Sequence, residues 1–183
     1  MTIDLLTGAA ALHRIGAGGV RLLTEAATAS TFLRDDLAPH ERADVRRVVD
    51  ISTGCCEAAA QNEHQHFVAA FVDGRFGGYV ISTRHGPGDH ELDWLMVHPD
   101  CHGTAVSAVL MQAGMVWLGL DRPMWLNVLR HNQRAQRFYR RFGFEIDPAA
   151  TTGHVMPHWV MRRPPGPLAH GAAPDTAAPP APG

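Results

Sequence analysis

The sequence predicts one α/β domain of the α+β kind, and three observations support this class. The chain has 183 residues, 45% of them hydrophobic, which is enough for one sizeable core and too little for two ordinary domains. An Asp73-Gly74 pair between two β-rich runs predicts an antiparallel hairpin. Strand-like and helix-like runs then alternate from Glu91 to Arg141.

The N-terminal third is expected to contain one strand and two helices. Residues 1–19 are interpreted as an N-terminal extension, apolar enough to pack as a short helix and ended by the glycines of 16–19. Residues 20–25 are predicted to form the first strand. Helical spacing of apolar residues then predicts helices over 30–37 and 39–60.

The middle third is expected to be antiparallel sheet. The hairpin strands are predicted over 66–72 and 75–84, and a third strand over 91–97. Alternation along this third strand predicts one face with Glu91, Asp93, Leu95 and Val97, and an opposite face with Leu92, Trp94 and Met96. Two carboxylates on an otherwise apolar strand require a partner or a function.

The C-terminal third alternates helix and strand before it loses its apolar residues. We predict a helix over 104–118, a strand over 124–129, a helix over 133–141 and a last strand over 154–161. From Pro164 onward Pro, Ala and Gly dominate, so residues 164–183 cannot repay the entropy of ordering and are expected to be a disordered tail.

Composition bounds the partners and the compartment. The formal charge of -2 gives no electrostatic reason to expect nucleic acid or an anionic membrane as a partner. Cys55, Cys56 and Cys101 are odd in number and two are adjacent, which suits a reducing cytoplasm better than a disulfide framework. No basic segment precedes the first apolar residues, so a soluble, untargeted cytoplasmic protein is expected. The oligomeric state stays open, with a homodimer as the candidate assembly.

The turn over 100–108 is rich in small residues and lies between a predicted strand and a predicted helix. Small side chains let a ligand approach the backbone, and the first turn of a helix offers N–H groups that lack helical acceptors. The turn is therefore a candidate phosphate site. Tight packing alone also produces such turns, and this alternative stays open.

A second segment about thirty residues later carries a more specific pattern. After the strand over 124–129, the chain reads Asn-x-x-Ala-x-x-x-Tyr-x-x-x-Gly-Phe at Asn132, Ala135, Tyr139, Gly143 and Phe144. Together with the turn, this segment resembles the signature motifs of the GNAT superfamily of acyl-CoA-dependent N-acetyltransferases. In the first of the two motifs, the residues here depart from the commonest family residues at His102, Ala105 and Ser107.

The resemblance covers residues 20–163, which we take as the domain. It implies a central, mostly antiparallel, twisted sheet of about seven strands, splayed between strands 4 and 5, with helices on both faces. It also implies acetyl-CoA as a co-substrate, with its pyrophosphate on the turn and its pantetheine arm beside the strand. The implied binding residues are Leu95, Met96, Val97, His102, Gly103, Thr104, Ala105, Val106, Ser107 and Asn132.

Within this set the resemblance assigns two specific roles. The backbone amide of Leu95 would point at the thioester oxygen, as oxyanion-hole donors do. Asn132 would contact the arm from the other side. Asn132 is equally well placed to cap the helix that follows it.

The resemblance also supplies candidates for the chemistry. Glu91 stands at the position of the general base in several family members, roughly 13 Å along the strand from Leu95, so it would act through water. Asp93 is a second candidate base, and a structural ion pair with an arginine is the alternative for both. Tyr139 is the candidate acid for the leaving thiolate; its alternative role is to fill the core beside Phe138.

The reaction implied is transfer of an acetyl group to a primary amine of a small molecule or peptide by direct attack. A non-catalytic acyl-CoA-binding or sensor domain is the rival hypothesis, motivated by the three departures in the first motif. A metal-binding protein is a third, because His64, His66, His85 and His90 lie near one another in sequence. No Cys or carboxylate completes a ligand spacing with them, so no metal is expected.

Overall fold

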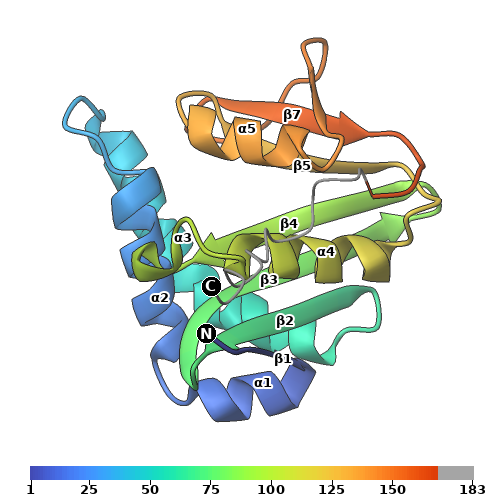
Figure 1. Cartoon of the computed structure of the whole chain (residues 1–183). Helices are drawn as coiled ribbons and strands as arrows, with labels where there is room; N and C mark the ends of the chain where they lie inside the picture. Colours follow the sequence, from blue (N-terminus) through green and yellow to red (C-terminus); the bar gives the residue numbers. More distant parts are fainter. Residues whose placement is uncertain (169–183) are drawn as a thin grey trace, which may run out of the picture.

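The structure is a computed structural model that describes residues 1–168. Within them, seven strands form one mixed sheet in the order β1-β2-β3-β4-β5-β7-β6, with helices packed on both of its faces (Figure 1). All neighbouring strands are antiparallel except β4 and β5. The predicted class is confirmed. The strands are β1 (Ile3–Thr7), β2 (Gln65–Val72), β3 (Arg75–Gly86), β4 (Asp89–Val97), β5 (Met124–Leu129), β6 (Glu145–Asp147) and β7 (His158–Arg163).

The helices of the described residues divide between the two faces. A short 3₁₀-helix, η1 (Pro99–Cys101), leads from β4 toward α4. Contacts place α1, α2 and α3 against one face of the sheet and α4 against the other. The α-helices are α1 (Gly8–Ile15), α2 (Gly19–Thr31), α3 (Pro39–Gln61), α4 (Val106–Leu118) and α5 (Gln133–Arg140). No helix within residues 1–168 combines the length and apolar character needed to cross a bilayer.

The N-terminal region differs from the sequence-based prediction. Residues 1–19, expected to be an extension, contain the edge strand β1, which pairs with β2, and helix α1. The strand predicted over 20–25 is wrong, because this stretch lies in α2. Thr24 and Thr28 donate their hydroxyls to the carbonyls four residues earlier, so these β-branched residues fit a helix.

The helix predicted over 30–37 is also wrong, since α2 ends at Thr31 and a loop reaches Pro39. The long helix α3 is confirmed. It begins with Pro39 in its first turn, and the backbone N–H of Ala38 donates to the carboxylate of Glu41 at 2.8 Å. These signals fix the start of α3, and the loop before it brings Phe32 to the rim of the site described below.

The hairpin of β2 and β3 is confirmed, with Asp73 and Gly74 both at positive φ in its turn. Strand β4 contains a feature that alternation could not predict. Ile81 pairs with Trp94 while Ser82 pairs with Leu92, so Asp93 is the extra residue of a β-bulge.

The bulge corrects the predicted faces of β4. Leu92, Leu95 and Val97 pack in the core on the α4 side, whereas Trp94 and Met96 pack on the side of α1 to α3. The predicted grouping of Leu92 with Trp94 and Met96 is therefore wrong. One inserted residue shifts the period-2 pattern by one position, so every side chain on one side of the bulge changes face.

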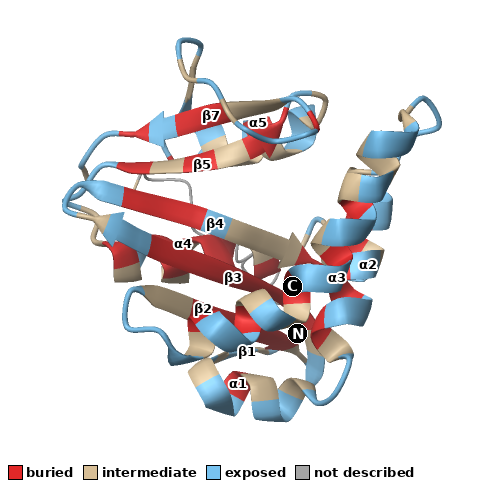
Figure 2. Cartoon of the chain, turned by 180° about the vertical axis from the view of Figure 1, so that it is seen from behind, coloured by how far each residue is buried: buried red, intermediate tan, exposed pale blue. Residues whose placement is uncertain are grey.

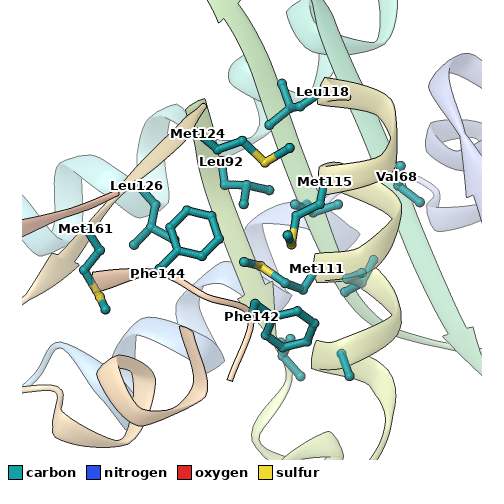
Figure 3. Close-up of a cluster of buried hydrophobic side chains, with 14 of the residues drawn as sticks. Val68, Leu92, Met111, Met115, Leu118, Met124, Leu126, Phe142, Phe144 and Met161 are labelled. Carbon is teal, nitrogen blue, oxygen red and sulfur yellow. The ribbon is translucent and has the colours of Figure 1, made fainter. Parts of the chain in front are cut away.

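The core lies on both faces of the sheet. The larger cluster joins α4 to β3, β4, β5 and β7, and Figure 3 shows its side chains gathered around Leu92. The cluster includes four methionines, whose flexible thioethers can fill irregular space. Those in the cluster are Met111, Met115, Met124 and Met161. The second cluster packs α1, α2 and α3 against β2 and β3.

The end of the described chain is more ordered than composition predicted. Strand β6 was not foreseen, and β7 begins at His158 rather than 154. The buried Arg163 donates to the carbonyls of Phe142, Pro164 and Pro167, so residues 164–168 lie against the domain. The rest of the expected tail, residues 169–183, lies outside the described residues.

The two strands that matter most for the site pair only once. β4 and β5 are matched at Glu91 and Trp125 and nowhere else in the described ladder, which confirms the predicted splay. In Figure 1 the two ribbons are close at one end and diverge toward the other. Figure 2 shows the consequence along β4, which changes from buried to intermediate exposure beyond Asp93.

Candidate active site

A cavity of about 750 Å³ lies where β4 and β5 separate. It collects most of the residues that the sequence singled out, although these come from four different elements. The predicted residues that line it are Glu91, Asp93, Leu95, Met96, Val97, His102, Gly103, Thr104, Ser107, Asn132 and Tyr139. Ala105 and Val106 are predicted site residues that do not line the cavity.

The conformation of the turn before α4 determines which of its residues face the cavity. Gly103 has φ +79°, a conformation that favours glycine, and a Cβ there would meet no atom within 4 Å. Val106 is fully buried in the core, so it could serve a ligand only through its backbone. The hydroxyl of Thr104 accepts from the N–H of Val106, the first residue of α4, at 3.3 Å.

His102 is held beside a cation. The guanidinium of Arg134 lies 3.1 Å from His102 Nδ1, and because a guanidinium only donates, Nδ1 is the unprotonated nitrogen. Burial and the charge of Arg134 lower the pKa of His102. A neutral imidazole next to Arg134, at the start of α4, makes this end of the cavity a place for an anion.

Helix α5 closes the cavity from the other side. Asn132 Oδ1 accepts from the N–H of Ala135 at 3.0 Å, so the capping role of Asn132 is confirmed. Tyr139 packs its ring against Phe138 and Phe144. Within residues 1–168 its hydroxyl has no hydrogen-bond partner, and desolvation raises its pKa to about 12. The phenol therefore faces the cavity as a protonated donor.

Glu91 is the most perturbed carboxylate at the site. Its side chain is 9% exposed, and its Oε2 lies 2.7 Å from His85 Nε2. Desolvation, reinforced by the negative charge of Asp93, raises the pKa of Glu91 to about 7, although the bond to His85 opposes this shift. The amide of Asn127 donates a weak hydrogen bond to Oε1 at 3.5 Å. A carboxyl that titrates near neutrality suits acid–base chemistry.

Asp93 occupies the bulge and faces the cavity. Its carboxylate has one weak partner, the hydroxyl of Thr83 at 3.5 Å, and no arginine within residues 1–168 pairs with it. Desolvation by burial raises the pKa of Asp93, while the charge of His85 opposes the rise. The ion pair with an arginine, considered as the alternative role of Glu91 and Asp93, is found for neither in the described part of the chain.

The far half of the cavity is lined by α3 and by the segment before β7. Asp44 and Arg47 form an ion pair of 3.2 Å on α3, and Phe32 and Cys55 contribute less polar surface. The rings of His154 and His158 contact each other in a tilted arrangement, with centroids 4.3 Å apart and planes 42° apart. Burial lowers the pKa of His158 to about 4, so this ring is neutral.

Other histidines proposed as metal ligands are placed elsewhere. His66 stacks on Trp117, and His90 lies 3.3 Å from the carbonyl of Pro123. Within residues 1–168, no group of three or more His, Cys, Asp and Glu side chains is arranged to hold a metal ion.

Sequence reasoning missed three residues near the site. Arg134, on the first turn of α5, reaches His102 across the cavity; its position two residues after Asn132 was the available signal. Asn127 is a polar residue within an apolar strand, and this was a second signal. His85 was identified only as a border of the cleft, because a contact between residues six apart across a turn depends on register.

Sequence comparison finds relatives that align with only part of this chain. The chain is 41% identical over 83 residues to uncharacterized N-acetyltransferases from Mycobacterium tuberculosis and Mycobacterium bovis, which covers 43% of this chain and 52% of each relative. The chain thus spans about half the length of the curated relatives it matches.

Comparisons of structure extend over the whole fold. The PaiA N-acetyltransferase from Thermoplasma acidophilum, in complex with coenzyme A, superposes with a TM-score of 0.71 at 16% identity, over 90% of this chain and 99% of that chain. An acetyltransferase from Thermus thermophilus gives 0.60 at 18%, over 90% and 97%. At these identities the likeness establishes the fold. The sequence pattern of the acetyltransferase (GNAT) family matches residues 26–144, more than half of the chain, and the chain therefore belongs to that family.

Proposed function

We propose that the protein is an N-acetyltransferase that transfers an acetyl group from acetyl-CoA to a primary amine of a small molecule or peptide by direct attack. One observation carries this proposal: a buried carboxyl with a pKa of about 7, Glu91, shares one cavity with the turn before α4 and with the hydroxyl of Tyr139, which has no hydrogen-bond partner within the described residues. Together they offer a base, an acid and a phosphate site for acetyl transfer.

The CoA pyrophosphate would lie at the turn before α4. The open space over Gly103, the cation of Arg134 and the first-turn N–H groups of α4 fit a phosphate there. Ala105, whose departure from the family residue motivated the sensor hypothesis, does not line the cavity and so does not obstruct this approach. The structurally similar acetyltransferase from Thermoplasma acidophilum is in complex with coenzyme A, which supports a CoA thioester as the cosubstrate here.

The amine must lose a proton before it attacks. A primary amine with a pKa near 10.4 is about 99.9% protonated at pH 7, and forming the free base costs roughly 4 to 5 kcal/mol. Glu91, with a pKa of about 7, is partly ionised at that pH and can accept this proton through water. Asp93 faces the same cavity and its negative charge attracts the ammonium form of the acceptor.

Attack on the thioester carbonyl places a negative charge on its oxygen and then expels a thiolate. Beyond Glu91 the edge of β4 that faces β5 has no strand partner among residues 1–168, so the amide of Leu95 is proposed as the donor to the oxyanion. Tyr139 is proposed to donate its phenolic proton to the departing sulfur. The second proton of the attacking nitrogen, lost after attack, restores the phenol, and the proton that Glu91 has taken leaves to solvent. Asn132, already used as a helix cap, would contact the pantetheine arm through its remaining polar atoms.

The test measures acetyl-CoA-dependent release of CoA thiol against a panel of small and peptidic amines, together with calorimetric binding of acetyl-CoA. We expect amine-dependent thiol release with formation of the N-acetyl product. Tight binding of acetyl-CoA without turnover on any amine would favour the acyl-CoA sensor. No binding of acetyl-CoA would reject both functions.

A further inference from the structure

The candidate base, Glu91, is hydrogen-bonded by His85, a side chain to which the proposed function assigns no role. His85, at the end of β3, places Nε2 2.7 Å from Glu91 Oε2. An ionised carboxylate only accepts hydrogen bonds, so Nε2 carries the proton in this contact. The His85 side chain is 42% exposed, while that of Glu91 is 9% exposed. A solvent-facing ring therefore holds one oxygen of a buried carboxylate.

The ring of His85 is itself held in place by β5. It stacks on Trp125 with centroids 5.9 Å apart and planes 20° apart. The indole N–H of Trp125 in turn donates to Asp89 at 2.6 Å. Glu91 and Trp125 are also the one matched pair between β4 and β5. We call His85, Asp89, Glu91 and Trp125 the splay cluster, because it lies at the point from which the two strands diverge.

We propose that His85 is a positioning residue for Glu91: it holds Oε2 at the closed end of the splay and leaves Oε1 to take the proton from the acceptor amine. This inference rests on the proposed function. In the proton transfer, one proton passes from the ammonium through water to Oε1, and the hydrogen bond from His85 Nε2 to Oε2 remains. One carboxylate oxygen, Oε2, thus stays bonded to His85, and the other, Oε1, is the proton acceptor.

The charges around the pair indicate what loss of His85 would do. Asp93 and Asp89 face Glu91 with negative charge and favour its neutral form, whereas His85 favours the ionised form. Asn127 contributes a weak amide contact, and Thr83 bonds Asp93 rather than Glu91. Without His85 only the weak amide contact of Asn127 opposes burial, so the pKa of Glu91 should rise further.

The chain contains a matched control. His66 stacks on Trp117 with centroids 5.1 Å apart, but Arg84 rather than a carboxylate adjoins this second stack. Substitutions at His66 therefore remove the same ring from the same kind of stack without touching a base. His66 does not line the cavity.

The first experiment compares pH profiles of kcat/KM for the parent, His85→Ala, His85→Gln and His66→Ala, with the best amine acceptor. For His85→Ala we expect at least a tenfold loss at pH 6.5, a smaller loss at pH 8.5 and partial rescue by added imidazole. His85→Gln retains a donor and should lose less. The KM for acetyl-CoA should stay within about twofold in all variants, and His66→Ala should follow the parent.

A second measurement separates this inference from the proposed function. Carbon-13 NMR of carboxyl-labelled glutamate, with Glu91→Gln to assign the signal, follows the Glu91 titration whether or not an amine is acetylated. We expect the midpoint of Glu91 to move to higher pH in His85→Ala. An unchanged midpoint, or a uniform loss of activity at every pH without imidazole rescue, would overturn the positioning role. Parent protein that acetylates no amine would instead reject the proposed function.

Discussion

The two edges of β4 differ in how completely they pair with the neighbouring strands. Toward β3 the strand is matched at eight positions from Asp89 to Val97, whereas toward β5 it is matched at one. On the β3 side, glycine allows atoms of β4 to come closer than a side chain would permit. A Cβ on Gly78 would lie 2.7 Å from the carbonyl oxygen of Met96. On the β5 side the strands enclose a cavity of about 750 Å³.

The difference teaches where stability and chemistry lie in this fold. An edge matched along most of its length satisfies most of its backbone groups and supports close packing, so it contributes to the free energy of unfolding. An unmatched edge leaves backbone groups and titratable side chains in a partly desolvated space, where their pKa values shift and a ligand can bind. Substitutions at the two edges should therefore fail in different assays.

The largest effect is expected from Glu91→Gln. We expect turnover at pH 7 to fall by roughly 10²- to 10⁴-fold, the usual contribution of a positioned base, with partial recovery at high pH where free amine is abundant. Asp93→Asn is the paired variant, because it also alters a cavity-facing carboxylate. If Asp93→Asn shows the pH-dependent rescue and Glu91→Gln does not, the base is Asp93.

The same substitution should change stability in the opposite direction. The folded pKa of Glu91 is raised from 4.5 to about 7, so its protonated form favours folding below about pH 4.5 and this contribution is lost as pH rises through 7. Glu91→Gln should therefore unfold like the parent at pH 4.5 and be more stable above pH 7, by on the order of 1 to 3 kcal/mol. Chemical denaturation at both pH values measures this, and equal stability at pH 8 would contradict a desolvated carboxylate.

Tyr139→Phe should have the next largest effect on turnover. A thiol has a pKa near 8.5, so its thiolate is a good leaving group and depends less on an acid than the amine, with a pKa near 10.4, depends on a base. We therefore expect turnover of Tyr139→Phe to fall by roughly 10²-fold at saturating substrate. Stability should change by less than about 0.5 kcal/mol, because the hydroxyl has no partner within residues 1–168.

The only other tyrosine of the chain is the matched control. Tyr79 is buried on β3 and its hydroxyl bonds Thr24 at 2.8 Å. Tyr79→Phe should cost about 1 kcal/mol of stability and leave turnover intact. Turnover of Tyr139→Phe within about threefold of the parent would assign that ring to structure.

Gly78→Ala tests the matched edge. The new Cβ would meet the Met96 carbonyl at 2.7 Å and Leu110 Cδ1 at 3.0 Å, so β3 must move away from β4. We expect a loss of about 2 to 3 kcal/mol, or roughly 5 to 10 °C in Tm. Gly54→Ala is the control, because Gly54 lies in α3 with open space around it and should gain up to about 1 kcal/mol. An unchanged Tm for Gly78→Ala would mean that the two strands are not tightly fixed.

Features decided by local sequence were more predictable than features decided by strand pairing. The Asp73-Gly74 hairpin, α3 after Pro39 and β5 were predictable, because local turn chemistry and periodicity decide them. The Asp93 bulge was not, since a strand can accommodate an extra residue only in relation to its partner. α2 was mistaken for a strand because its threonines suit both conformations until their hydroxyls find carbonyls four residues back.

The candidate site followed the same division. The pattern from Asn132 to Phe144 identified α5 and Tyr139 from sequence, because residues of one helix keep fixed spacing. The contacts of Glu91 with His85 and of His102 with Arg134 join different elements, and only the folded register creates them. Sequence thus indicated which residues carry the proposed chemistry and missed those that position or assist them.

The smallest predicted effect concerns the anion end of the cavity. Arg134→Ala removes the cation 3.1 Å from His102 and should raise the KM for acetyl-CoA by roughly 5- to 10-fold, the cost of one solvent-exposed charge-assisted contact to phosphate. The kcat should hardly change, because the contact is equal in the ground and transition states. Arg140 lies on the same helix, adjoins Glu145 at 3.8 Å and does not line the cavity, so Arg140→Ala supplies the control. Equal KM values for the two variants would place the pyrophosphate elsewhere, and a KM effect that weakens with added salt would confirm that charge is what Arg134 contributes.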